Sequence, residues 1–203
     1  MAEQSYSGVC TAPRLKHWDE ILLRWCAIVE QHCRIAGPGD VPWWNNEVAN
    51  AGLVAAAAIQ CGYPALVESP SKKGGSSGRL DLWVQFGMQK QGTHTEEECV
   101  EFKVANHDSS SRECDCQKHL YNAVNDARKI TTSCRNKIGA CVYKVIYEPD
   151  SKTTDEDLAR TQQQIRDNCP HDALAWAFPT CVRNVPEKGG WIVPGIVLAM
   201  KCV

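Results

Sequence analysis

The stretch RLDLWVQF (residues 79–86), followed by CVEFKVA (residues 99–105), decides the fold. In each stretch apolar side chains alternate with other residues, which predicts a β-strand because successive strand side chains point to opposite faces. Glu101 and Lys103 are two residues apart and therefore emerge on one face. Charges in such strands are costly unless they are paired, hydrated or metal-bound. Glu101, Lys103 and, on the preceding strand, Asp81 are thus the candidate functional residues.

The segments before this pair of strands are predicted to be mostly helical. Apolar residues at helical spacing predict a first helix over about 11–36. An alanine-rich second helix is expected from Trp44 or Asn45 to just before Gly62. A short strand over 63–68 and a flexible Gly/Ser-rich connection over 69–78 complete this part.

The segments after it are predicted to alternate between helix and strand. Ser110 and Glu113 have the spacing of a capping box, which indicates a helix from there to about residue 130. The run over 139–147 is rich in β-branched and aromatic residues and is typical of a central strand. Thr154 and Asp157 indicate a further helix start.

The last expected element is a strand within 191–202, and Pro194 inside it favours an edge position because proline cannot donate a ladder hydrogen bond. The fold class expected is α/β, with a central mixed β-sheet of about four to five strands flanked by helices. We expect a single domain with an N-terminal helix over about 11–36, a core over about 42–148, and a C-terminal helix and edge strand over about 152–203.

Composition limits the kinds of function. The chain has 203 residues and a formal net charge of −2, whereas a protein that simply coats nucleic acid is normally basic. Contacts to nucleic acid must therefore come from local patches, for which Lys72, Lys73 and Arg79 are the candidates. The N-terminus lacks the basic start and apolar region of a secretory signal, and no apolar run approaches membrane-spanning length. We expect a cytoplasmic protein with no membrane partner.

The three charged candidates suit metal-assisted hydrolysis. If the two strands pair as a hairpin, Asp81 and Glu101 can converge on one cation, and Mg²⁺ prefers such oxygen ligands. The cation can acidify a bound water and neutralise charge on a phosphate. Lys103 beside it could hold or deprotonate the attacking water, and the cation would lower the pKa of the lysine, which favours the second role.

The residues GRLDLWV (78–84) and VEFKV (100–104) resemble the GxxDxxV and VExKV signature of the PD-(D/E)xK, or restriction endonuclease-like, nucleases. The resemblance covers about half of the chain. It implies a restriction-endonuclease-like core and a Mg²⁺- or Mn²⁺-dependent deoxyribonuclease that hydrolyses phosphodiester bonds with a metal-activated water. DNA is the substrate implied, RNA stays open, and a homodimer is possible in such a family.

The resemblance also implies further site residues by their position. Glu47 in the second helix matches the family's helical glutamate, and the Phe102 carbonyl would join Asp81 and Glu101 as metal ligands. Glu68 matches a glutamate that the family often has on its first strand. Gln117, with Tyr121 one turn later, resembles a Gln/Tyr pattern on the helix after the lysine strand.

Alternatives remain open for each of these residues. The charges of Asp81, Glu101 and Lys103 could form a cross-strand ion pair on a solvated face. Glu47 could be a first-turn acid favoured by the helix dipole. At the level of function, the alternatives are a catalytically inactive nuclease-fold module that binds nucleic acid or protein, and a zinc-stabilised interaction protein. The zinc ligands would then come from Cys114, Cys116 and His119.

Overall fold

Seven strands pair into one mixed sheet in the computed structural model, counted over the residues it describes, which are 6–38, 40–44, 46–73, 76–87, 96–110, 115–187 and 189–203. Their order across the sheet is β1-β6-β7-β5-β4-β3-β2. β4 and β5 run parallel, and the other neighbours run antiparallel. The mixed α/β class is confirmed, but the sheet is larger than the expected four to five strands. The strands are β1 (Tyr6–Thr11), β2 (Ala65–Lys73), β3 (Ser76–Phe86), β4 (Glu96–Asp108), β5 (Asn136–Tyr147), β6 (Ala173–Phe178) and β7 (Ile192–Cys202).

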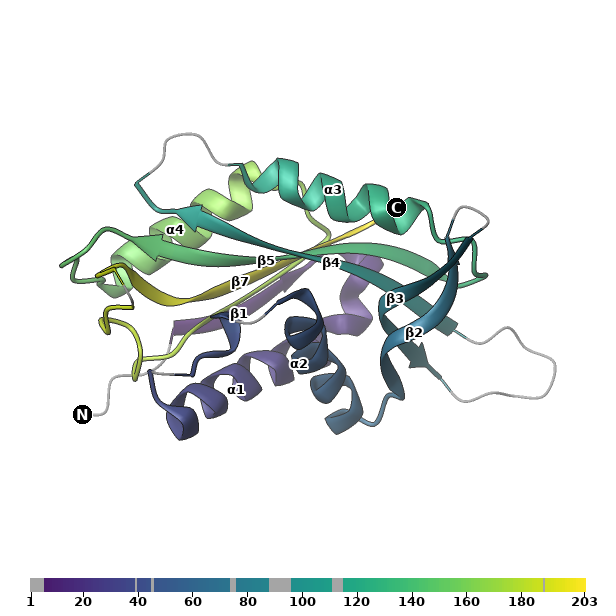
Figure 1. Ribbon diagram of the computed structural model, residues 1–203, viewed down its shortest axis with the longest axis horizontal. Helices are drawn as coiled ribbons and strands as arrows, with labels where there is room; N and C mark the ends of the chain where they lie inside the picture. Colours follow the sequence, from purple (N-terminus) through teal and green to yellow (C-terminus); the bar gives the residue numbers. More distant parts are fainter. Residues whose placement is uncertain are drawn as a thin grey trace.

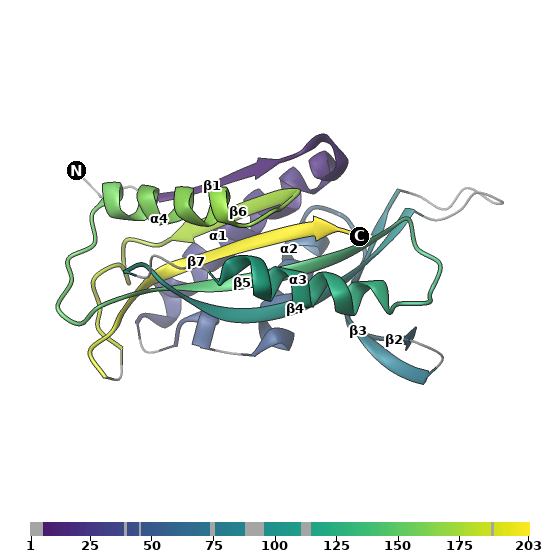
Figure 2. The ribbon, with the colours of Figure 1, turned by 90° about the horizontal axis from the view of Figure 1, so that it is seen from above.

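Helices cover both faces of this sheet (Figure 1). α1 and α2 pack against one face, and α3 and α4 lie on the other, as the view from above also shows (Figure 2). Among the described helices, none is both long and apolar enough to cross a membrane. The helices are α1 (Asp19–Ala36), α2 (Glu47–Gln60), α3 (Cys116–Arg128) and α4 (Asp155–Asn168), with short 3-10 helices η1 (Pro13–Trp18) and η2 (Pro42–Trp44).

Most elements that the sequence pattern predicts are present. The alternating stretches form β3 and β4, and β5 lies in the middle of the sheet as its composition predicts. The helix start predicted at Thr154 and Asp157 opens α4 with a capping box, in which Thr154 Oγ1 accepts from Asp157 N at 3.2 Å and Asp157 Oδ2 accepts from Thr154 N at 3.0 Å. Each of these elements has a strong local signal, which is an alternation of side chains, a composition typical of strands, or a helix cap.

β1 and β6 are absent from the sequence-based expectations. β6 has the sequence ALAWAF, and alanine has a low strand propensity, so its strand signal is weak. It forms a strand because β1 and β7 pair with it on either side and because its side chains are almost all buried. Tertiary burial therefore decides this element.

The prediction that the last strand lies at an edge is wrong. β7 pairs with β5 on one side and with β6 on the other. Pro194 is tolerated because the β6 ladder begins only at Ile196, and because the β5 ladder shifts register between Gly195 and Ile192. The proline therefore sits in a bulge where no ladder donor is needed.

Two local predictions are also wrong. Residues 69–73 and 76–78 are paired strand, from Ser69↔Leu80 to Lys73↔Ser76, and do not form a loose connection. The third helix begins at Cys116, later than the predicted capping box at Ser110. Ser110 instead donates through its backbone N and Oγ to Asp108 Oδ1, which forms a turn, and Glu113 lies outside the described residues.

A glycine brings α3 close to the sheet. A Cβ built on Gly139 of β5 would lie 2.3 Å from the backbone N of Val124 in α3, which is closer than any real contact. Gly139 is also the register partner of Glu101 in the parallel β4–β5 ladder. The helix therefore lies closely over the part of the sheet that carries Glu101 and Lys103.

Candidate active site at a strand fork

The predicted site lies where β3 and β4 separate. Their ladder runs from Phe86↔Glu96 to Leu82↔Val100 and ends there, whereas β4 continues along β5 to Asp108. Asp81 and Glu101 are the next residues beyond the last pair. They therefore stand at the fork of the two strands, where the edge of β4 is open toward β3.

The carboxylate of Asp81 fills the start of the fork. Its Oδ2 accepts a hydrogen bond from the backbone N of Phe102 at 2.7 Å, which fixes its orientation against β4. The N–H and C=O of one strand residue leave the strand on the same side. The Phe102 carbonyl therefore also faces the fork, in agreement with its predicted place among the oxygen ligands.

Lys103 connects the fork to two helices. Its Nζ lies 3.6 Å from Glu47 Oε2 at the start of α2 and 3.2 Å from Asp126 Oδ2 near the end of α3. Partial burial acts to lower the pKa of Lys103, but the carboxylates of Glu47, Asp126 and Asp81 outweigh it and raise the pKa. The side chain is therefore a cation at neutral pH in this arrangement.

Glu101 is the most enclosed acid of the site, with an exposed fraction of 3%. It lies on β4 between Val100 and Phe102, whose side chains belong to the core under α1 and α2. Because strand side chains alternate, Glu101 points to the opposite face, where α3 packs. An ionised carboxylate in such a place needs compensating charge.

Asp126 is a site residue that the sequence analysis did not select. It lies in the last turn of α3, where the helix dipole disfavours an acid. Lys103 and Lys129 compensate for this, with Lys129 Nζ at 2.7 Å from Asp126 Oδ1, and the pKa of Asp126 is lowered by these two lysines although burial acts to raise it. The sequence signal that could have identified Asp126 is an aspartate at the end of an amphipathic helix where the helix dipole disfavours an acid.

Gln117 does not join this group. It is in the first turn of α3, more than two turns before Asp126, which is roughly 13 Å along the helix axis. There it is exposed and lines a hollow of about 420 Å³ with Arg166 and His171 from the end of α4 and the segment after it. The structure thus places Asp126 of this helix at Lys103, and Gln117 elsewhere.

The remaining basic and acidic candidates lie along the β2–β3 hairpin. Glu68 Oε2 and Arg79 Nη1 form an ion pair of 2.7 Å, with 70% of the Arg79 side chain exposed. Lys72 and Lys73 lie on β2 near its end, and their side chains are outside the described residues. Arg79 therefore adds positive charge close to Asp81 in the sequence, while Glu68 pairs with it on the neighbouring strand.

The residues predicted as zinc ligands are described only in part. Cys116 is buried, with its Sγ at 3.4 Å from His107 Nδ1, and Cys114 lies outside the described residues. Across the described ranges, no group of three or more histidine, cysteine, aspartate or glutamate side chains stands in position to hold a metal ion. In the arrangement described, Lys103 takes the central position among the acids of the fork.

Comparison of the chain with family models, with curated proteins and with solved structures found no match.

Proposed function

We propose that the chain is a divalent-metal-dependent nuclease that hydrolyses phosphodiester bonds of DNA, with its active site at the β3–β4 fork. One observation carries the proposal. Acids from α2 and β3, together with the lysine of β4, meet at an opening of the sheet beside the buried Glu101. These are the residues for which the sequence resemblance implies catalytic roles.

The donor set fits a hard divalent cation in its chemistry. Asp81 and Glu101 supply carboxylates, the Phe102 carbonyl faces the same fork, and Glu47 can add a further carboxylate. Asp81 Oδ2 is held by the Phe102 N–H, and Oδ1 receives no hydrogen bond from the described residues. Mg²⁺ or Mn²⁺ bound here would neutralise charge on the phosphate and acidify water.

The chain's own residues supply the positioning. The Phe102 N–H orients Asp81, so that its second oxygen stays available on the open side of β4. Asp126 and Glu47 hold Lys103 in its charged form at the fork. Its ammonium can then donate to a phosphate oxygen or to the attacking water, and stabilise the charge that grows in the transition state.

A cleavage panel tests the proposal. Duplex, single-stranded and branched DNA and an RNA strand are incubated with Mg²⁺, with Mn²⁺ or with EDTA. Asp81→Ala, Glu101→Ala and Lys103→Ala should each reduce metal-dependent cleavage by about 10²-fold or more while circular dichroism shows an intact fold. Lys16→Ala is the matched control, because Lys16 forms an exposed ion pair with Asp19 away from the fork. Full activity of Asp81→Ala, or no cleavage with any divalent metal, would contradict the proposal.

One observation favours a second candidate function, an inactive nuclease-fold module that binds nucleic acid or protein. The ammonium of Lys103 lies between Glu47 and Asp126 and balances part of their negative charge. The two functions differ in their response to metal. A metal-binding nuclease gains thermal stability as Mg²⁺ or Mn²⁺ is added, because a ligand that binds the folded state stabilises it. An inactive module shows no such gain, and Asp81→Ala does not alter its melting temperature in metal.

A further inference from the structure

A second hollow lies further along the strand that carries Glu101 and Lys103. Its volume is about 510 Å³, and it is lined by the ends of β4, β5 and β7 and by the loop between β6 and β7. This volume is typical of sites for small organic groups. Asn106 lines it from β4, three residues after Lys103, which is about 10 Å along the strand and on the opposite face of the sheet.

The lining combines one flat aromatic ring with polar groups. Trp191 is 43% exposed, and Ile146 and Val193 form the apolar part of the wall. Asn106 and Lys144 line the polar part, and within the described part of the chain neither side chain makes a hydrogen bond or an ion pair. An amide with a donor and an acceptor, and an ammonium with three donors, are therefore available to a bound group.

The lining carries groups of both charge signs. Asp108 and Glu187 place carboxylates at the hollow, beside the ammonium of Lys144. A neutral ring that carries amino and carbonyl groups meets both acceptors and donors, and a carboxylate is a good acceptor for a ring amino group.

We propose that this hollow is a base pocket, which takes one nucleobase of the nucleic-acid strand bound at the fork. The indole of Trp191 stacks on the base, and the Asn106 amide, Lys144 and the two carboxylates contact its edge. The identity of the ligand rests on the proposed nuclease function. The geometry of the pocket does not.

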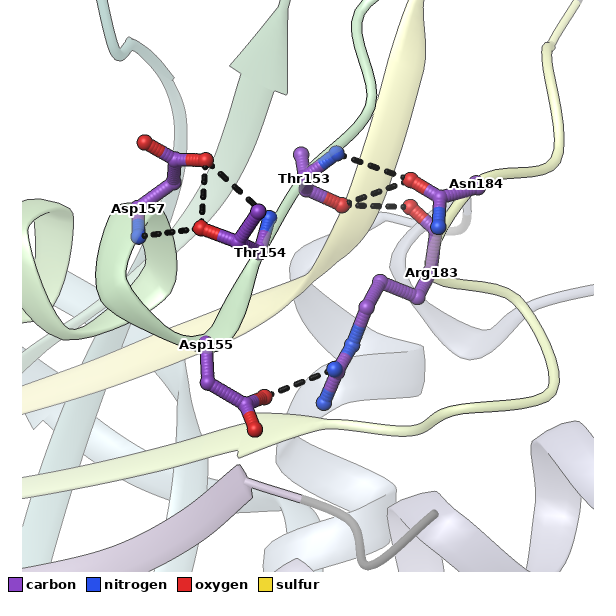
Figure 3. A network of polar contacts seen from close by, with 6 residues as sticks. All are labelled: Thr153, Thr154, Asp155, Asp157, Arg183 and Asn184. Atoms are coloured by element: carbon purple, nitrogen blue, oxygen red, sulfur yellow. Dashed lines mark hydrogen bonds and ion pairs between the residues drawn. The ribbon is translucent and has the colours of Figure 1, made fainter.

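The loop that carries Trp191 is held at its beginning by a network of polar contacts (Figure 3). Arg183 is 6% exposed, and its Nη1 lies 2.7 Å from Asp155 Oδ1 at the start of α4. Asn184 Oδ1 accepts from the backbone N of Thr153 at 2.9 Å. These contacts tie the start of the β6–β7 loop to the segment before α4.

The tip of this loop is closed by its own backbone. Glu187 N donates to Trp191 O at 2.8 Å, and Gly190 N donates to Glu187 O at 3.0 Å. Gly189 and Gly190 have φ values of 94° and 84°, which only glycine adopts without strain. The turn therefore sets Trp191 and Glu187 on the same wall of the pocket.

Nucleoside titration followed by NMR tests the base pocket. Adenosine, cytidine and thymidine are added to the ¹⁵N-labelled full chain, and the indole N–H signal of Trp191 is assigned with Trp191→Phe. We expect a saturable shift with a dissociation constant on the order of 1–10 mM, as for a single stacked base with a few hydrogen bonds. Trp191→Ala should weaken binding at least about tenfold, and Asn106→Ala about threefold, as measured by competition or calorimetry.

The controls separate the base from other ligands and the pocket from the nuclease. Leu23→Ala, an exposed apolar residue on α1, should leave nucleoside binding unchanged. Equal shifts with ribose 5-phosphate or inorganic phosphate, or no shift of Trp191 with any nucleoside, would overturn the base pocket even if the protein cleaves DNA. If nucleoside binding depends on Trp191 but the protein cleaves no nucleic acid, the base pocket is supported and the proposed nuclease function is contradicted.

Discussion

Two glutamates on β4, Glu98 and Glu101, are both buried but lie in different surroundings. Glu98 has no exposed surface, and its carboxylate lies 2.8 Å from His17 Nε2 and accepts from Trp18 Nε1 at 2.6 Å. Asn136 on the neighbouring strand donates a third hydrogen bond to it. One carboxylate therefore meets three donors from the rigid framework.

The site beside Glu101 has a different balance. There, the ammonium of Lys103 is shared by Glu47 and Asp126 and also interacts with Asp81, and Lys129 is a second partner of Asp126. Both glutamates are buried, with exposed fractions of 0% for Glu98 and 3% for Glu101, so burial alone does not indicate function. The excess of acids over donors distinguishes a place that can accept a cation from a place that holds the fold together.

The largest effect should come from comparing the same substitution made at each of the two glutamates in turn. Glu101→Gln removes one negative charge from the fork and should lower metal-dependent cleavage by about 10²-fold or more, with the melting temperature little changed. Glu98→Gln should leave the cleavage rate per folded molecule unchanged, because Glu98 faces η1. Rates are measured with the substrate that gives the best cleavage. Loss of activity in folded Glu98→Gln would erase the distinction between the two sites.

Complete removal of the Glu98 carboxylate should destabilise the fold. Glu98→Ala leaves His17, Trp18 and Asn136 without their buried acceptor, and we expect the free energy of unfolding to fall by about 3–5 kcal/mol. Urea denaturation measures this change in the free energy of unfolding. Glu101→Gln in the same assay should change the free energy of unfolding far less, and a comparable loss there would mean that Glu101 too is mainly structural.

The two ends of α3 give a smaller and more selective effect. Asp126→Asn removes one of the carboxylates that hold Lys103, and should lower the cleavage rate about tenfold, equivalent to about 1.4 kcal/mol in the barrier. Gln117→Ala, at the other end of the helix, should change the rate less than about twofold. The reverse order of the two effects would show that the residue implied by the family pattern acts in the site.

The smallest effect should come from the capping box of α4. Thr154→Ala removes the cap and should lower the free energy of unfolding by about 1 kcal/mol without changing cleavage. Hydrogen bonds from the Thr154 backbone and side chain lower the pKa of Asp157, so its contribution is present above the unfolded pKa of about 3.9 and is lost as pH falls through the lower folded pKa. The difference between Thr154→Ala and the parent should therefore shrink in acid, as measured by thermal unfolding at several pH values.

Local patterns were sufficient for the elements that carry the site. Alternation located β3 and β4, and placed Glu101 and Lys103 on one face, because the strand period depends on the backbone alone. Glu47 was located by its place in the order of elements, and it lies beside Lys103 in the structure. These are features that a sequence determines over short distances.

Features that depend on packing between distant segments were missed. β6 is a strand because β1 and β7 flank it, and Pro194 is tolerated in an interior strand because a bulge coincides with it. Asp126 joins the site because α3 crosses β4 at a particular point along its length, which the sequence pattern of the helix does not define. The same uncertainty of register along the helix led to the choice of Gln117.

Gly139 has a consequence for how related chains can be recognised. It lies beside Glu101 in the β4–β5 ladder, and a methyl group at this position would push α3 away from β5 and carry Asp126 away from Lys103. A chain that keeps this site should therefore keep a glycine in the strand parallel to its VEFKV segment. A search pattern that joins the two strand motifs to this glycine should find distant relatives more selectively than the charged residues alone.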